Sequence, residues 1–395
     1  MSEVGFQTGR YAYWKILMAR RDVEVSKGLI TRIPVDPINL PPKTMLSPLS
    51  IMRHAVGSVL DVRMDKARKI EEEKRIESAV FMPVRDGVVK RGDVVGILKV
   101  YPTTVKEGEP EARVEMKKYD AKIVYQKNSE LKRISCEVED GWYKRWHLAR
   151  WIPIVADENL EVEKGKVVRI KIRGFEVPDN TIPVPLNITR NPIGGFLDVI
   201  SPGKPKKVEE SRFINEAIFV PVINSSIEKG DIIGVLNIYY ISVGNFTPSI
   251  LRYLLKKEEA KIVYMKNGIL KRRKEKLPLL TFKRSEFGFL KPVISAEDKR
   301  LEKGEIDVIK IERIDFPSST IEQPISGVGL KDCCLLNLYS KAPKLIEEDK
   351  KIDRAIVCAT ENITIKRNDI ISAIAVYNVA ILIEPELFLA KYSVK

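Results

Sequence analysis

Histidine and cysteine are scarce in this chain of 395 residues, and their scarcity excludes several kinds of site. The two histidines, His54 and His147, lie far apart in sequence, and the four cysteines form no Cys-x-x-Cys pair. A zinc site built from these residue types is therefore not expected, and a Ser-His-Asp triad is disfavoured. The adjacent Cys333 and Cys334 predict small apolar filler in a reducing compartment.

Motifs that bind phosphate or activate a nucleophile are also absent. The chain has no Gly-x-Gly-x-x-Gly after a predicted strand, no phosphate-loop Gly-Lys-Ser/Thr, no His-Glu-x-x-His and no Gly-x-Ser-x-Gly elbow. We therefore expect no catalytic residues, no cofactor and no metal site. A non-enzymatic protein is favoured over an enzyme.

Long apolar runs are missing as well. The longest, from Ala373 to Ile383, is about half a membrane span and is interrupted by Asn378. The chain begins Met-Ser-Glu-Val-Gly, without a basic and then apolar leader. These features predict a soluble, cytoplasmic protein that has no membrane partner.

The charge balance is strongly basic, with 68 Lys and Arg against 54 Asp and Glu, a net charge of +14 and a pI near 9.4. Such a balance can indicate an anionic partner. The chain is also rich in Lys, Glu and Ile and has only three glutamines, a bias typical of thermostable proteins from hyperthermophiles. Both interpretations stay open.

An internal repeat is the most informative feature. Two motifs recur twice, each time 138 residues further on, and a third, Pro-x-x-Thr-x-x-x-Pro, recurs at similar spacing. The copies of the first motif begin at Ala79, Ala217 and Ala355, those of the second, Lys-Arg-Gly-Asp-Val-Val-Gly in its first copy, at Lys90, Glu228 and Lys366, and those of the third at Pro41, Pro178 and Pro317. The chain is therefore predicted to hold three tandem units, residues 10–145, 146–283 and 284–395, the third ending before the hairpin that closes the other two.

Each unit is predicted to be mainly β. Val167–Ile172 alternates apolar and polar residues, and Asn128-Ser129 and Asn267-Gly268 are hairpin turn signals. Helix is sparse, and the best candidate is Pro248 to Ala260. We expect three homologous β-barrel or sandwich-like units with few short helices, arranged around a pseudo-threefold axis or as beads.

With these motifs repeated three times, the chain resembles an archaeal family, the domain of unknown function number twenty-two, which occurs in one to three copies per protein. The resemblance covers nearly the whole chain and implies an archaeal, cytoplasmic protein. The family brings no established activity and no catalytic residues. The third copy departs from the pattern, with Asn368 for the glycine and Ala359 for the proline.

The proline loops are the first candidate site. They place three threonines at matching positions, followed in two copies by an arginine close to a glycine, and these residues are Thr44, Thr181, Thr320, Arg53 and Arg190. Arginine and threonine beside glycine could hold a phosphate or carboxylate. Alternatively, the prolines shape a crossing between strands and each threonine caps the turn. Gly329 occupies the arginine position of the third copy, which favours the second interpretation.

Two segments are candidates for nucleic-acid binding. Residues 141–151 hold three of the four tryptophans among basic residues, and residues 271–274 are all basic. Aromatic rings stack on bases while cations contact phosphates. The alternative for the first segment is that its aromatic residues join the first unit to the second. The candidate residues are Trp142, Lys144, Arg145, Trp146, Lys271, Arg272, Arg273 and Lys274.

The repeated turn aspartates Asp93, Asp231 and Asp369 could bind a cation on a pseudo-axis or accept hydrogen bonds from their own turns, and the second is favoured. Taken together, the sequence favours a non-enzymatic binding or scaffold protein that presents a basic surface to RNA or a ribonucleoprotein. The alternatives are a small anionic metabolite-binding protein or enzyme with sites between the units, and a subunit whose only task is assembly in a protein complex.

Overall fold

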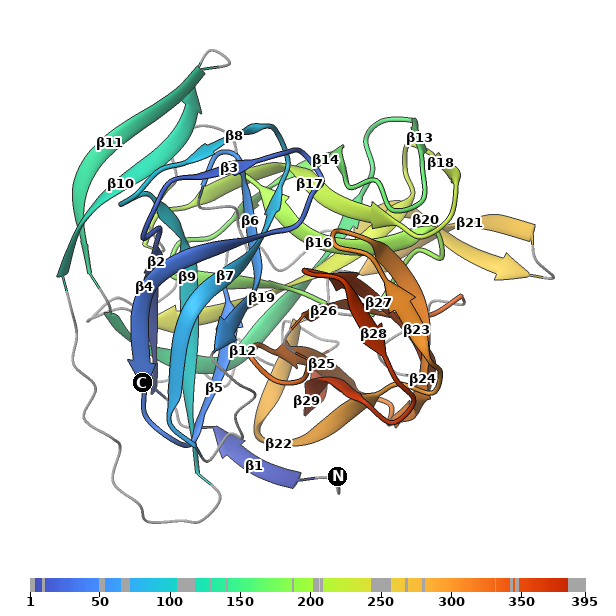
Figure 1. Ribbon diagram of the computed structural model, residues 1–395. Helices are drawn as coiled ribbons and strands as arrows, with labels where there is room; N and C mark the ends of the chain where they lie inside the picture. Colours follow the sequence, from blue (N-terminus) through green and yellow to red (C-terminus); the bar gives the residue numbers. More distant parts are fainter. Residues whose placement is uncertain are drawn as a thin grey trace, which may run out of the picture.

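The chain is built from β-strands, and the part that the computed structural model describes contains no helix (Figure 1). The described residues are 4–8, 11–49, 54–64, 72–104, 118–127, 130–139, 141–186, 188–201, 206, 209–242, 257–266, 269–278, 281–330, 332–341, 344 and 348–382. The helix predicted from Pro248 is wrong where it can be compared, because residues 257–260 begin strand β20 (Lys257–Lys266). Pairing with β21 (Ile269–Pro278) satisfies the backbone of that segment. Residues 248–256 lie outside the described part.

Each unit is a sandwich of two antiparallel layers, which confirms the predicted fold class in its sandwich form. One layer is a separate three-stranded sheet, and the other is part of a ten-stranded sheet that runs through all three units. In unit 1 the first sheet holds β2 (Tyr11–Met18), β9 (Val94–Thr104) and β5 (Thr44–Pro48), and the second holds β4 (Thr31–Leu40), β7 (Lys74–Pro83) and β6 (Gly57–Met64). A short ribbon of β3 (Val23–Val25) and β8 (Gly87–Val89) completes the unit. The two sheets stay separate in the described residues rather than closing into a barrel.

Units 2 and 3 repeat this layout strand for strand. In unit 2 the counterparts, in the same order, are β12 (Gly141–Val155), β19 (Ile232–Ser242), β15 (Thr181–Pro185), β14 (Val168–Val177), β17 (Arg212–Pro221), β16 (Gly194–Ile200), β13 (Leu160–Val162) and β18 (Ser225–Ile227). In unit 3 they are β22 (Thr281–Ile294), β29 (Ile370–Leu382), β25 (Thr320–Ile325), β24 (Ile306–Phe316), β27 (Lys350–Ala359), β26 (Cys333–Tyr339), β23 (Lys299–Leu301) and β28 (Ile363–Ile365).

The middle strands β7, β17 and β27 explain why the units associate. In each strand the first residues alternate between buried and more exposed, whereas the last five are all buried. Successive side chains of a strand point to opposite faces, and Ala79 and Phe81 accordingly belong to the core of unit 1 while Val80 and Met82 belong to a separate apolar cluster. Another part of the protein must therefore cover the face of each middle strand that points away from the core of its own unit.

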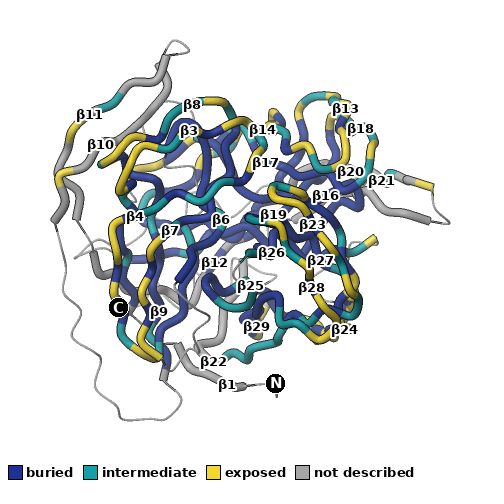
Figure 2. Tube along the Cα trace, in the orientation of Figure 1, coloured by how far each residue is buried: buried dark blue, intermediate teal, exposed yellow. Residues whose placement is uncertain are grey.

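The other two units supply this cover. The cluster that holds Val80 also holds its counterparts Ile218 and Ile356, so all three units contribute to one core on a common pseudo-threefold axis. Figure 2 shows the buried segments gathered where the units meet. The closed pseudo-threefold arrangement, and not a row of beads, is therefore the architecture of this chain.

Exchanged strands close the ring. The beginning of β12 pairs with β2 of unit 1, with Tyr143 opposite Ala12, before β12 continues as the first strand of unit 2. In the same way the beginning of β22 pairs with β12. Strand β1 (Val4–Thr8) occupies the third equivalent place, because it pairs with β22, Phe6 lying opposite Gly288. Each unit therefore receives a strand from its neighbour.

Two hairpins extend outward from this ring (Figure 1). They are β10 (Lys118–Lys127) with β11 (Glu130–Glu139), and β20 with β21. Lys127 lies opposite Glu130, and Lys266 lies opposite Ile269. The predicted turn residues Asn128-Ser129 and Asn267-Gly268 lie outside the described residues.

Candidate functional site

The turn aspartates hold their own turns. Oδ2 of Asp93 accepts a hydrogen bond from the N–H of Lys90 at 2.8 Å, and Asp231 and Asp369 accept the N–H groups of Glu228 and Lys366 at 2.9 and 2.8 Å. The turn interpretation of these residues is confirmed.

Two of these aspartates also anchor the outward hairpins. Arg133 on β11 places Nε 3.2 Å from both carboxylate oxygens of Asp93 and donates from Nη2 to the carbonyl of Val88 at 2.7 Å. Arg272 on β21 repeats the arrangement, with Nε 3.0 Å from both oxygens of Asp231 and Nη2 2.7 Å from the carbonyl of Ser226. Both carboxylates are fully buried. Each hairpin is therefore fastened at one charge-assisted contact.

A buried histidine distinguishes the two anchors. Nε2 of His54 lies 3.2 Å from Oδ2 of Asp93, and Nδ1 accepts the N–H of Val56, so the proton of the neutral ring sits on Nε2. Burial lowers the pKa of the His54 imidazole, against the attraction of Asp93. Burial alone would raise the pKa of Asp93, but hydrogen bonds from His54, Arg133 and the Lys90 amide hold it below its ordinary value.

Unit 2 lacks this imidazole. Asn191 replaces His54 and bonds the backbone, accepting from the N–H of Ile193 and donating to the carbonyl of Ile232. Burial raises the pKa of Asp231, against hydrogen bonds from the Glu228 amide and Arg272. Two differences act in opposite directions on these pKa values: the imidazole of His54 lowers the pKa of Asp93, and the charge of Glu228 raises that of Asp231.

The proline-loop threonines have buried side chains that cap their own turns. The hydroxyls of Thr44, Thr181 and Thr320 donate to the carbonyl three residues earlier at 2.9, 2.6 and 2.6 Å. A cation repeated at one position, Arg212 in unit 2 and Lys350 in unit 3, adds contacts to the threonine of the same unit.

Among the described residues, Arg190 and the three threonines are buried and do not form one open site. Arg190 is buried at the contact between units 2 and 3, where its charge acts on the carboxyl of Glu322, a side chain only 1% exposed. Burial raises the pKa of Glu322, against the attraction of Lys350 and Arg190. Arg53 lies outside the described residues.

The nucleic-acid candidates fall on two elements. Trp142, Lys144 and Arg145 lie on β12, and Trp146 lies in the irregular stretch between Arg145 and Ala149; the side chains of these four residues are not among the described ones. Residues 271–274 lie on β21, and there the guanidinium of Arg272 is bound to Asp231, with Glu228 3.2 Å away. Arg272 is therefore an anchor of the ribbon on which the other three residues lie.

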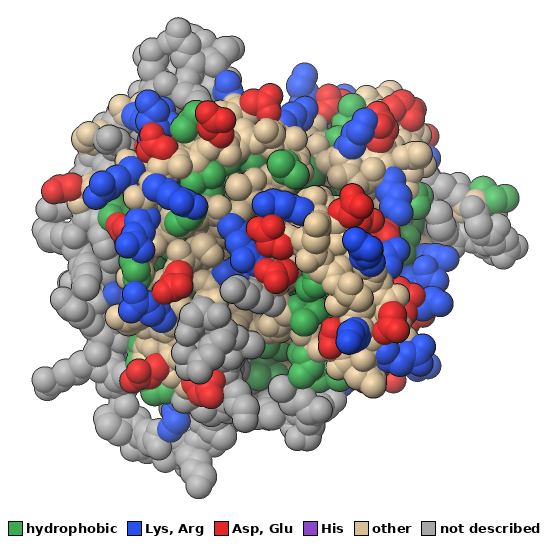
Figure 3. Space-filling view, viewed as in Figure 1, with side chains coloured by type: hydrophobic (Ala, Val, Ile, Leu, Met, Phe, Trp, Pro, Cys, Tyr) green, Lys and Arg blue, Asp and Glu red, His purple; other side chains and the backbone are tan. Residues whose placement is uncertain are grey.

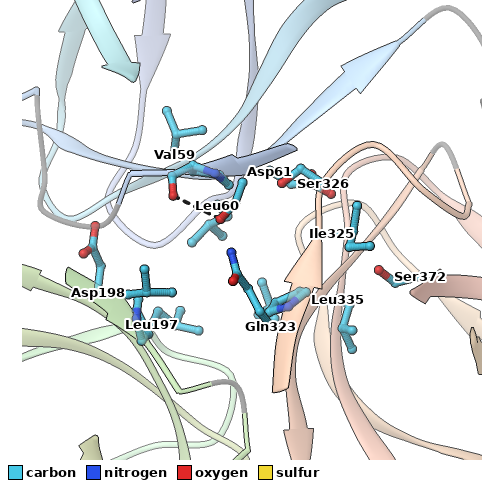
Figure 4. A pocket seen from close by; sticks show the side chains of 16 residues that line it. Val59, Leu60, Asp61, Leu197, Asp198, Gln323, Ile325, Ser326, Leu335 and Ser372 are labelled. Atoms are coloured by element: carbon cyan, nitrogen blue, oxygen red, sulfur yellow. Dashed lines mark hydrogen bonds between the residues drawn. The ribbon is translucent and has the colours of Figure 1, made fainter. Parts of the chain in front are cut away.

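A small cavity of about 70 Å³ lies between the units and is lined by polar and apolar residues of all three. Figure 4 shows Gln323 of unit 3 pointing into this space beside Leu60, while the carboxylate of Asp198 points away from it. Asp198 instead accepts the hydroxyl of Ser58 from unit 1. A cavity of this size can hold ordered water, and among the described residues no group of three His, Cys, Asp or Glu side chains is placed to hold a metal ion.

The three equivalent positions Asp61, Asp198 and Asn337 join the units in a cycle. Asp61 accepts the N–H of Gly327 in unit 3 at 3.1 Å, Asp198 bonds unit 1, and Asn337 donates to the carbonyl of Phe196 in unit 2 at 3.3 Å. These contacts have a structural role.

Cys333 and Cys334, predicted to be small apolar filler, are buried. Cys333, Cys334 and Cys358 are unpaired and buried, and burial raises the pKa of each thiol. A thiol that stays protonated is a poor nucleophile and metal ligand.

The basic charge is not concentrated on the face shown in Figure 3. Lys and Arg side chains alternate there with Asp and Glu. The excess of basic residues is clearest on one hairpin. Strands β20 and β21 contain eight Lys and Arg against three Glu, whereas β10 and β11 contain five against four acidic residues.

Arg133 and His54 are functional residues of the anchors that sequence reasoning missed. Arg133 matches Arg272 within the two hairpins, and that correspondence could have indicated a shared role. No comparable signal marks His54, because Asn191 replaces it in the second copy.

The fold and the anchors define a class of protein: an all-β ring of three tandem units that carries anchored, outward-pointing hairpins. The chain belongs to the family described as domain of unknown function DUF22, which matches residues 1–87, 120–225 and 259–378. This confirms the resemblance stated from the repeated motifs.

A relative supports the archaeal assignment. The uncharacterized protein MJ0614 of Methanocaldococcus jannaschii is 31% identical over 91 residues, which make up 23% of this chain and 70% of that protein. No solved structure matches the chain. Within the described residues, no helix is long and apolar enough to cross a membrane.

Proposed function

We propose that this protein is a non-enzymatic, cytoplasmic scaffold whose β20–β21 ribbon binds RNA, alone or within a ribonucleoprotein. The observation that carries the proposal is the concentration of eight basic residues on a two-stranded ribbon that extends from the ring. Two-stranded ribbons are established nucleic-acid readers, and Lys and Arg bind phosphates by releasing counterions. The buried, unpaired thiols support a reducing compartment.

The anchor gives the ribbon a defined direction. Arg272 lies opposite Val263, three residues from the last pair at the turn end of the ribbon. Because Arg272 is bound to the buried Asp231, the ribbon is held against unit 2 partway along its length. A ribbon fixed at one point along its length loses less conformational entropy when it binds than a free segment does. The tryptophan-containing stretch of β12 is a second contact in this proposal, where rings would stack on bases.

Filter binding with single-stranded RNA at a series of salt concentrations tests the proposal. Substitution of Lys271, Arg273 and Lys274 by Ala, with Arg272 kept, should weaken retention and lower the slope of log K against log salt by about 2, at roughly 0.7 per lost phosphate contact. The matched control replaces Lys118, Lys122 and Lys132 of the other hairpin by Ala and should change the slope little.

Absence of salt-sensitive retention by the unsubstituted chain would contradict RNA binding. Equal losses in the two triple variants would show that the ribbon is not the binding element.

A further inference from the structure

The hairpin anchor of units 1 and 2 has a third copy that no hairpin of the described chain occupies. In both occupied copies an arginine guanidinium bonds a turn aspartate and the middle carbonyl of the short strand beside it, Val88 in β8 and Ser226 in β18. The counterparts in unit 3 are Asp369 and the carbonyl of Thr364 in β28. No arginine among the described residues reaches Asp369, which is partly exposed, whereas Asp93 and Asp231 are fully buried.

The apolar residues beside this third anchor are also more exposed than their counterparts in the other units. Val94 and Ile232, which follow the first two turn aspartates, are each 6% exposed, but their counterpart Ile370 is partly exposed. Ile294, which lies opposite Ile370, is also partly exposed, although its counterpart Val155 in unit 2 is buried. In unit 1 the hairpin strands β10 and β11 contact β9 and β2, the strands that carry the equivalent surface.

We propose that unit 3 is a docking site for an arginine-bearing β-hairpin of a different protein. Its guanidinium would bond Asp369 and the Thr364 carbonyl, and its strands would cover Ile294 and Ile370. The two internal hairpins define the geometry of such a partner, since both offer an arginine on the second strand, six residues before its end in each case. A second copy of this chain is not the occupant, because both of its hairpin arginines are already bound to their own units. This inference goes beyond RNA binding and does not depend on it.

The probe for this site is a synthetic peptide of residues 257–278, closed by a disulfide across its open end. Its binding to the full-length protein is measured by fluorescence anisotropy at about 0.3 M salt, where long-range attraction is screened. The peptide should bind with one-to-one stoichiometry, because the internal copy of the hairpin keeps unit 2 occupied at high effective concentration. Asp369→Asn should weaken binding at least about tenfold, since asparagine can cap the turn but cannot pair with a guanidinium.

Two controls make the result specific. Asp298→Asn removes the same charge from a neighbouring exposed turn, where Asp298 accepts the N–H of Arg367, and should leave the affinity unchanged. A peptide in which Arg272 is replaced by Lys should bind as weakly as the native peptide binds the Asp369 variant. The proposal is overturned if the native peptide shows no saturable binding, if both aspartate variants bind it equally, or if the lysine peptide binds as well as the native one.

Discussion

The backbone N–H of Gly327 in unit 3 lies 3.1 Å from Oδ1 of Asp61 in unit 1, and it joins the last repeat of the chain to the first. Arg63 donates to the same carboxylate at 2.8 Å and to the carbonyl of Cys333. Contacts of this kind follow one another around the axis, so the three units behave as one folded body.

The first prediction concerns closure of the ring by β1. Phe6→Pro removes a backbone donor from a strand that pairs with both β22 and β9. We expect faster hydrogen exchange at residues 287–290 and a loss of about 1–2 kcal/mol in unfolding free energy, roughly one or two net hydrogen bonds. Phe6→Ala keeps the donor and is the control for the side chain. Unchanged exchange at these amides in the proline variant would contradict the role of β1.

The second prediction concerns the hairpin anchor. Arg272→Ala leaves the buried carboxylate of Asp231 without its cation, and loss of one partner of such a pair costs about 3 kcal/mol. Urea unfolding measures this loss of stability. The backbone amides of β20 and β21 should also exchange hydrogen faster in the variant. Lys229→Ala breaks the exposed pair with Asp157 and should cost less than about 1 kcal/mol. Similar losses in both variants would argue against the anchor.

The third prediction is a pH dependence. The folded-state pKa of His54 is lowered from 6.5 by burial, so the unfolded chain binds the proton more readily than the folded one. Stability from this group is complete above pH 6.5 and is lost as the pH falls below that value. His54→Asn, the residue found at the matching position of unit 2, should flatten the decrease of the urea midpoint between about pH 6.5 and 5. An unchanged decrease in this variant would assign the acid sensitivity to other groups.

The fourth prediction concerns the buried pair in unit 3. Nζ of Lys350 lies 3.3 Å from Oε1 of Glu322, and both side chains are 1% exposed. Lys350→Met alone leaves Glu322 without its nearest cation and should cost about 3–5 kcal/mol. Combining it with Glu322→Leu should recover at least half of that loss, because the uncompensated carboxylate is gone. A double variant as unstable as the single one would show that Glu322 also compensates the buried charge of Arg190.

The sequence by itself determined the repeat, the strands of each unit and the turns between them. Alternation in residues 167–172 and the turn aspartates act over a few residues, where backbone geometry and nearby hydrogen bonds decide the conformation. The predicted helix is wrong over residues 257–260, where pairing with β21 outweighs the local helix signal.

Only the tertiary structure decided how the units meet. The apolar ends of β7, β17 and β27 require a cover on both faces, but their sequence is the same whether another unit or another chain supplies it. The pairing of β1 with β22, the cycle through Asp61 and the anchoring of Arg133 join residues far apart in the chain. Such contacts depend on the shape of the assembled ring, and no local pattern encodes that shape.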